Sequence, residues 1–219
     1  MQLTALQYGS TTLPENMIRT DGDASKRYPI ALLLFLIETP TKKILVDVGC
    51  DTMPGFDLIT HESPVVTLER AGVRREEITD IILTHHHHDH ADALRYYPHA
   101  LVHVHENEFG KVRQYLLPTQ RVLSFATPFA LDTGVRVVPV CGHTDGSCVV
   151  EVDAEDCTVV LCGDECYHRD CFSFPHLSGG SRNRENTLAF FEKYSAAHYH
   201  TVLFHDPALV GEIGAKKLL

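Results

Sequence analysis

A run of four histidines followed by Asp-His, at residues 85–90, constrains the fold of this chain more than any other feature. The spacing His-x-His-x-Asp-His occurs in one register only, which selects His85, His87, Asp89 and His90. The run leaves a predicted strand, Asp80–Thr84, and alternate side chains of an extended chain point to the same side. Imidazole and carboxylate groups are common metal ligands. The side chains of His85 and His87 can therefore converge on one metal ion. The alternation breaks at Asp89-His90, which turns these two side chains toward a neighbouring ion and leaves His86 and His88 as spacers.

A solvated histidine loop or a purification tag is the alternative interpretation, but a tag is normally terminal and is not followed by Asp-His. Two ions need more than four ligands, and three candidates each follow a predicted strand. They are His143, Asp164 and His205, after the strands at 135–140, 158–161 and 201–204. Loops at strand ends build sites on a rigid scaffold, so we expect these side chains on one rim. We assign His85, His87 and His143 to one ion, Asp89, His90 and His205 to the other, and Asp164 to a bridge.

The remaining pattern alternates predicted strands and helices. An antiparallel hairpin is expected over Ile30–Thr39 and Ile44–Val48. Other expected elements are a helix over 65–71, strands at 101–105, 122–125 and 148–152, helices over 106–115 and 185–197, a long functional loop over 165–182 and a short closing helix. Sequential antiparallel strands with interspersed helices predict an α/β sandwich in which sheets pack together and helices cover them. We expect one domain, 1–219.

Composition excludes several classes of function. A net charge of -10 without a Lys/Arg cluster opposes binding to nucleic acid. Met1 to Gly9 lacks the pattern of a signal peptide, and the longest apolar run, Ile30 to Ile37, is too short to span a bilayer. Seven cysteines without regular spacing fit reduced thiols. We therefore expect a cytoplasmic protein without a membrane partner, and the 15 histidines favour a metal site.

These motifs together resemble the metallo-β-lactamase superfamily. The resemblance rests on Thr-His-x-His-x-Asp-His at 84–90, Gly-His-Thr-Asp-Gly-Ser at 142–147, Gly163-Asp164 and the late His205. It implies an αβ/βα four-layer sandwich with a dinuclear site, usually of two zinc ions, with iron and manganese as alternatives. Asp145 stands where the family often has proline, which leaves every ligand in place. Asp47 matches a family aspartate that orients a ligand histidine; a hydrogen-bonded turn residue is the alternative.

The resemblance also implies hydrolysis of an activated acyl compound by a hydroxide that the two ions hold. Zinc lowers the pKa of its water to about 7, and a second ion polarises the carbonyl. The closest local match is to N-acyl-homoserine lactonases, because Tyr167 follows Asp164 by three residues and His205-Asp206 resembles their end motif. In this interpretation the substrate is a small ester or lactone. Tyr167 then donates a hydrogen bond to the oxyanion and Asp89 carries a proton to the leaving alkoxide; a packing role for Tyr167 is the alternative.

Two other activities stay open. A glyoxalase II-like thioesterase would share the same ligands, and a persulfide dioxygenase-like oxidoreductase would hold one iron through His85, His143 and Asp164. The stretch between Gly49 and His85 is shorter than the substrate-covering segment expected of homoserine lactonases. His103 and His105 share a strand face but lack a partner carboxylate at matching spacing, so we interpret them as ordinary strand residues. The sequence leaves the natural substrate and the oligomeric state open.

Overall fold

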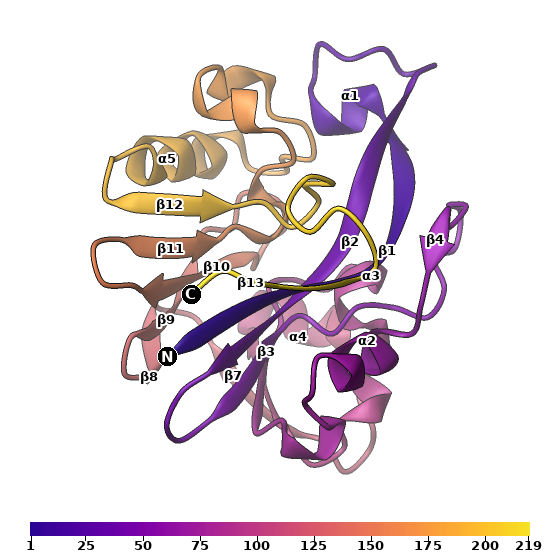
Figure 1. Cartoon of the computed structure of the whole chain (residues 1–219). Helices are drawn as coiled ribbons and strands as arrows, with labels where there is room; N and C mark the ends of the chain where they lie inside the picture. Colours follow the sequence, from indigo (N-terminus) through magenta and orange to yellow (C-terminus); the bar gives the residue numbers. More distant parts are fainter.

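Two sheets face each other in the computed structural model, which describes residues 1–219 (Figure 1). The larger sheet has the order β13-β1-β2-β3-β5-β6-β7, with β4 paired to β1. Its strands are β1 (Gln2–Pro14), β2 (Arg27–Glu38), β3 (Lys43–Val46), β4 (Thr60–His61), β5 (Asp80–Ile82), β6 (Leu101–His105), β7 (Arg121–Phe125) and β13 (Gly214–Lys217). The smaller sheet has the order β12-β11-β10-β9-β8. Its strands are β8 (Phe129–Asp132), β9 (Val135–Pro139), β10 (Cys148–Asp153), β11 (Thr158–Leu161) and β12 (Tyr199–Val202).

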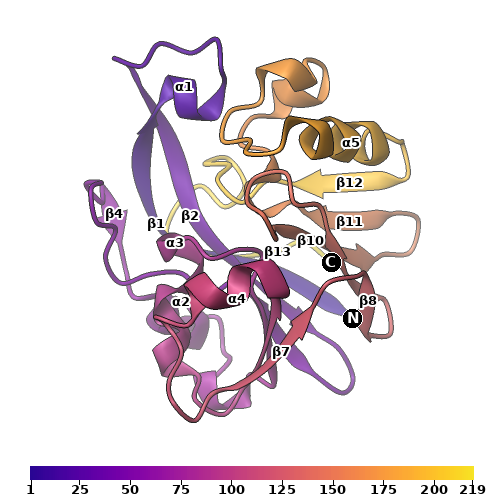
Figure 2. The same cartoon turned by 180° about the vertical axis from the view of Figure 1, so that it is seen from behind.

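Helices cover the outer face of each sheet (Figures 1 and 2). The larger sheet carries α2 (Pro64–Arg70), α3 (His88–Ala91) and α4 (Glu106–Val112), and the smaller sheet carries α5 (Arg184–Tyr194). A short helix, α1 (Glu15–Ile18), lies at the tip of the β1–β2 hairpin. Three separate buried clusters fill the three interfaces between these layers. This is the predicted α/β four-layer sandwich.

Strand β2 shows why the sequence folds this way. Its side chains at 30, 32, 34 and 36 pack under the helices, whereas those at 31, 33, 35 and 37 pack between the sheets. Because both faces are buried, the strand is a continuous apolar run. Phe35 meets Phe204 across the sheets with ring centroids 4.6 Å apart.

Several predicted elements are confirmed and others are wrong. The hairpin β2–β3, helix α2 and strands β6 and β11 lie where the sequence indicates. The expectation of sequential antiparallel strands fails for β3, β5, β6 and β7, which pair in parallel through intervening helices. The predicted closing helix is instead β13, an edge strand that pairs with β1. The long loop over 165–182 contains two short 3-10 helices, Arg169–Phe172 and Pro175–Leu177, and β4 and β8 were not expected. That 1–219 form one domain stays a prediction.

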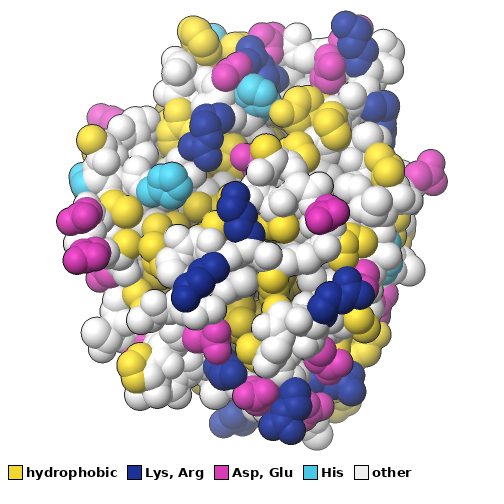
Figure 3. Space-filling view, in the orientation of Figure 1, with side chains coloured by type: hydrophobic (Ala, Val, Ile, Leu, Met, Phe, Trp, Pro, Cys, Tyr) yellow, Lys and Arg dark blue, Asp and Glu magenta, His cyan; other side chains and the backbone are white.

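On the surface, Lys and Arg side chains lie interspersed with Asp and Glu over the face drawn in Figure 3, without a basic stripe. Every helix of the chain is too short or too polar to cross a lipid bilayer.

Candidate metal centre

The seven predicted ligands lie just past strand ends or in the turn that follows. His85 and His87 follow β5, and α3 begins at His88, so that the chain changes from extended to helical before Asp89 and His90. His143 follows β9, Asp164 follows β11 and His205 follows β12. The structure brings these side chains together in two groups, in each of which the ligand atoms lie within 4.8 Å of one another.

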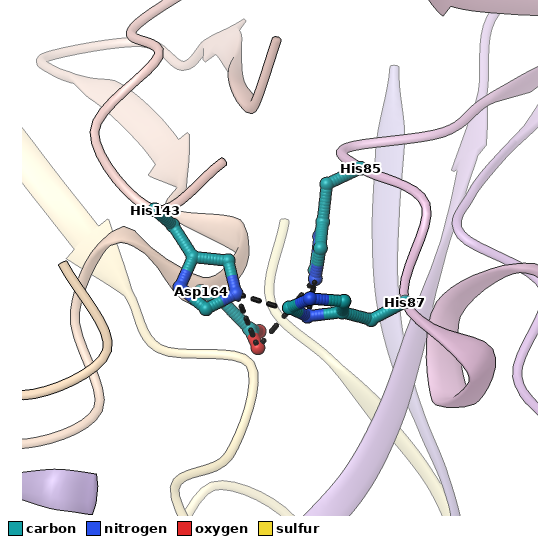
Figure 4. Close-up of side chains that lie close together, drawn as sticks. All are labelled: His85, His87, His143 and Asp164. Carbon is teal, nitrogen blue, oxygen red and sulfur yellow. Dashed lines mark hydrogen bonds and ion pairs between the residues drawn. The ribbon is translucent and has the colours of Figure 1, made fainter. Parts of the chain in front are cut away.

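The first group consists of His85, His87, His143 and Asp164 (Figure 4). The Nδ1 atom of His87 lies 2.9 Å from Nε2 of His85 and 3.1 Å from Nε2 of His143. Oδ2 of Asp164 lies 3.7 Å from Nε2 of His85 and 3.5 Å from Nε2 of His143. Three nitrogens and one carboxylate oxygen therefore surround a common point.

The second group consists of Asp89, His90 and His205. Oδ2 of Asp89 lies 3.6 Å from Nε2 of His90 and 3.8 Å from Nε2 of His205. Oδ1 of Asp164 lies 3.2 Å from Nε2 of His90 and 3.1 Å from Nε2 of His205. The two oxygens of Asp164 thus face different groups, which is the placement expected of a bridging carboxylate.

Two buried atoms at this point have no hydrogen-bond partner, namely Nε2 of His90 and Oδ1 of Asp164. They lie near each other without the geometry of a hydrogen bond. A buried polar atom left unsatisfied costs about 1 to 3 kcal/mol. Their convergence with the other ligand atoms fits cations, which would satisfy both.

The second ring nitrogen of four ligand histidines contacts a protein oxygen. Nδ1 of His85 lies 3.0 Å from Oγ1 of Thr84, and Nδ1 of His143 lies 2.7 Å from the Gly180 carbonyl oxygen. Nδ1 of His205 lies 2.8 Å from the carbonyl oxygen of Ala31. Such partners fix the tautomer and leave Nε2 free to ligate a metal.

Asp47 is the partner of the fourth histidine. Its Oδ2 lies 2.7 Å from Nδ1 of His90 and accepts a hydrogen bond from Oγ1 of Thr84, while its Oδ1 accepts one from the Thr84 N–H. Asp47 is fully buried and has a φ of 60°, a conformation that Asp and Asn adopt more readily than most residues. The structure therefore shows the contact that the hypothesis requires, between Asp47 and the ring of the ligand His90.

Burial and charge set the protonation of the ligands. Burial lowers the pKa of His85 and His143, and that of His87 to about 4, which keeps these rings neutral. Burial also opposes ionisation of Asp164, but the histidines around it hold its pKa well below its usual range. A carboxylate beside the neutral imidazoles of the first group is a donor set that a divalent transition metal binds. In the second group, burial is outweighed by the carboxylates of Asp164 and Asp89, which raise the pKa of His90 and His205.

Tyr167 lies against this centre. Its ring stacks on that of His205, with centroids 5.3 Å apart and an angle of 6° between the planes, and its hydroxyl donates a hydrogen bond to Oδ2 of Asp164. Asp89 and Tyr167 both line a cavity of about 410 Å³ next to the ligands. The phenol is therefore within reach of a molecule bound there.

The cavity has one apolar wall, formed by Leu13, Met17, Met53, Pro54 and Phe56. Its other wall is the metal centre. No lysine or arginine lines the cavity. Although the stretch between Gly49 and His85 is short, three of its residues lie in the apolar wall. A cavity of this size and polarity is typical of small-molecule sites.

Two glutamates contact the ligand segments although the sequence did not single them out. Glu165 accepts hydrogen bonds from the N–H groups of Gly142 and His143, at 3.3 and 3.1 Å. Glu108 contacts the loops around His87 and His143. Adjacency to Asp164 is a signal for Glu165, whereas Glu108 lies among polar residues of a helix and resembles a solvent-facing position.

His103 and His105 lie outside both groups. Nε2 of His103 lies 2.8 Å from Oδ1 of Asp80, and the His105 side chain accepts the N–H of Asn107 at the start of α4. Both have structural contacts, in agreement with their interpretation as strand residues.

Comparison with known proteins gives the family of this chain. A family model of the metallo-β-lactamase superfamily matches residues 33–204. Two proteins named "probable metallo-hydrolase", from Mycobacterium bovis and Mycobacterium tuberculosis, are each 29% identical over a 184-residue alignment that covers 65% of this chain. The chain spans 59% of the length of these relatives.

Solved structures share the fold at low identity. A quorum-quenching N-acyl homoserine lactone hydrolase superposes with a TM-score of 0.84 at 19% identity, covering 96% of this chain and 93% of the other. AidC, a dizinc quorum-quenching lactonase, has a TM-score of 0.76 at 19% identity, covering 94% and 88%.

Proposed function

This chain belongs to the metallo-β-lactamase superfamily, and we propose that it is a hydrolase that uses two metal ions to open the ester or lactone bond of a small, uncharged acyl substrate. The observation that carries the proposal is Asp164, whose two oxygens face two separate groups of ligands beside an apolar cavity. The dizinc lactonase with the same fold supports zinc as the metal.

Divalent ions, when bound, would lower the pKa of a bound water and polarise a substrate carbonyl. The chain itself supplies the orientation. The first group and the second group would hold the ions beside the cavity. Tyr167, whose hydroxyl donates to Oδ2 of Asp164 in this structure, would redirect that hydrogen bond to the carbonyl oxygen as negative charge develops there. Asp89, on the cavity wall, would take the proton that the attacking water gives up and pass it to the leaving alkoxide.

The part of the cavity away from the metal centre favours an uncharged substrate. Glutathione thioesters and β-lactams carry carboxylates, and a buried carboxylate needs a cationic partner. No lysine or arginine lines the cavity, so a carboxylate that lies against the apolar wall would have no cationic partner. Lactones and esters with apolar acyl groups fit the wall formed by Met53, Pro54 and Phe56.

The two alternatives fit less well. A glutathione-dependent thioesterase would place an anionic peptide along an apolar wall that no lysine or arginine joins. A mononuclear iron oxidoreductase would use His85, His143 and Asp164, and would leave the group of Asp89, His90 and His205 without a role.

The test is a panel of uncharged lactones and aryl esters beside glutathione thioesters and β-lactams, run on protein whose metals have been quantified. We expect two metal ions per chain and turnover that favours the uncharged lactones and esters. Metal-loaded protein that turns over none of the acyl substrates, or only the anionic ones, would contradict the proposal.

A further inference from the structure

We propose that Glu108 is a positioning residue of the metal centre, because its carboxylate ties together the two loops that carry His87 and His143. The inference rests on the proposed function only in taking these histidines as metal ligands. Glu108 lies in α4, outside the ligand segments, and is completely buried.

Each oxygen of Glu108 contacts a different loop. Oε2 accepts a hydrogen bond from the His86 N–H at 3.0 Å and also contacts Nδ1 of the His86 ring. Oε1 accepts hydrogen bonds from Oγ1 of Thr144 and from the Gly146 N–H, both at 2.9 Å. One carboxylate therefore joins the segment that leaves β5 to the segment that leaves β9.

These contacts lie next to the ligands. His86 precedes His87 and is held through its backbone N–H, whereas Thr144 follows His143 and is held through its hydroxyl, with the backbone of that loop held at Gly146. His87 and His143 are the pair whose ring nitrogens lie 3.1 Å apart in the first group. The spacer His86, which has no place in either group, thus acts as an anchor for His87.

The packing around Glu108 leaves little room for adjustment. A Cβ atom on Gly146 would lie 2.9 Å from Cγ of Glu108 and 2.5 Å from Nδ1 of His105, so the loop approaches α4 as closely as only glycine allows. Although burial opposes ionisation, hydrogen bonds from His86, Thr144 and Gly146 lower the pKa of Glu108 to about 2. The carboxylate is therefore charged at neutral pH and can accept hydrogen bonds from the His86 N–H, the His86 ring, the Thr144 hydroxyl and the Gly146 N–H.

The test is Glu108→Gln, with metal affinity measured by chelator competition on the full chain. Glutamine has one acceptor oxygen, and its amide nitrogen would face donors on one of the two loops. Loss of a hydrogen bond to a ligand side chain typically weakens metal binding about 10- to 100-fold, and Glu108, which acts one residue away from the ligands, should lie at the lower end of that range. We expect this loss for one ion per chain, with the affinity for the other ion unchanged.

Glu151→Gln is the matched control. Glu151 is also a buried glutamate with several donors, Arg136, Lys193 and Tyr194, but it lies on β10 under α5, outside both groups. We expect this variant to lose stability and to keep the affinity for both ions. Equal loss of affinity in the two variants, or wild-type affinity in Glu108→Gln, would overturn the inference.

If Glu108→Gln does not fold, Thr144→Val is the second variant, because it removes one of the four contacts to Glu108. Its metal affinity is measured by the same chelator competition. Weaker binding of one ion supports the inference, and unchanged binding overturns it. Metal affinity is independent of turnover. A wild-type protein that binds two ions but hydrolyses nothing would refute the proposed function and leave the role of Glu108 standing.

Discussion

Asp47→Asn is the substitution that probes the second group of ligands most selectively. Asparagine tolerates the positive φ of 60° at this position, so the backbone is not strained. Its amide oxygen can replace Oδ1, which accepts the Thr84 N–H at 2.7 Å. Its amide nitrogen then takes the place of Oδ2, beside Oγ1 of Thr84 and Nδ1 of His90.

The consequence is a change of tautomer in His90. An amide nitrogen donates where the carboxylate accepted, so Nδ1 of His90 must become the acceptor and the proton moves to Nε2. Nε2 is the atom that faces Asp89 and Asp164, and a protonated nitrogen cannot ligate a metal. We expect affinity for one ion to fall about 10- to 100-fold, which corresponds to about 1.4 to 2.7 kcal/mol.

Chelator competition measures this loss, and thermal unfolding of the metal-free variant serves as the control for folding. The ion in the group of His85, His87 and His143 should lose less affinity, because Asp47 reaches this group only through Oγ1 of Thr84, which can accept from both the amide and Nδ1 of His85. Wild-type affinity for both ions in Asp47→Asn would refute the reasoning, because the His90 tautomer would then not depend on Asp47.

Three further predictions concern catalysis and stability. Tyr167→Phe should lower kcat about 10²- to 10³-fold with unchanged metal content, as expected for the loss of one oxyanion donor; undiminished kcat on the true substrate would dismiss the role. Phe35→Ala should lower the free energy of unfolding by about 3 to 5 kcal/mol in urea denaturation, because Phe35 is fully buried between the sheets; a change below about 1 kcal/mol would contradict this packing. Burial opposes ionisation of Glu151, but hydrogen bonds from Lys193 and Arg136 hold its pKa below the ordinary 4.5. Its stabilisation is therefore complete above the unfolded pKa and is lost as the pH falls through the lower folded pKa. Melting temperatures should fall more steeply with acidification in the wild type than in Glu151→Gln, and parallel curves would contradict this.

Local sequence patterns were sufficient to predict much of the fold and to choose the metal ligands. The apolar runs at Ile30–Thr39 and Ile44–Val48 predict a hairpin, which forms as β2 and β3. The spacing within residues 85–90 selects four ligands without any tertiary information. His143, Asp164 and His205 could be chosen because each follows a strand, and strand ends meet at a rim.

Other features depend on contacts between distant segments. The strand β13, Gly214–Lys217, has little strand signal of its own and forms because β1 offers an unpaired edge. The parallel pairing of β3, β5 and β6 follows from helices that return the chain across the sheet. Glu108 was missed because its partners lie 22 to 38 residues away, and no local pattern marks a carboxylate that closes such a distance.

The central claim is that Asp164 separates two metal positions. Anomalous diffraction at the absorption edge of the bound metal tests it directly. We expect two anomalous peaks per chain, one among His85, His87 and His143 and the other among Asp89, His90 and His205, with one oxygen of Asp164 toward each. A single peak in fully metal-loaded protein would contradict the account.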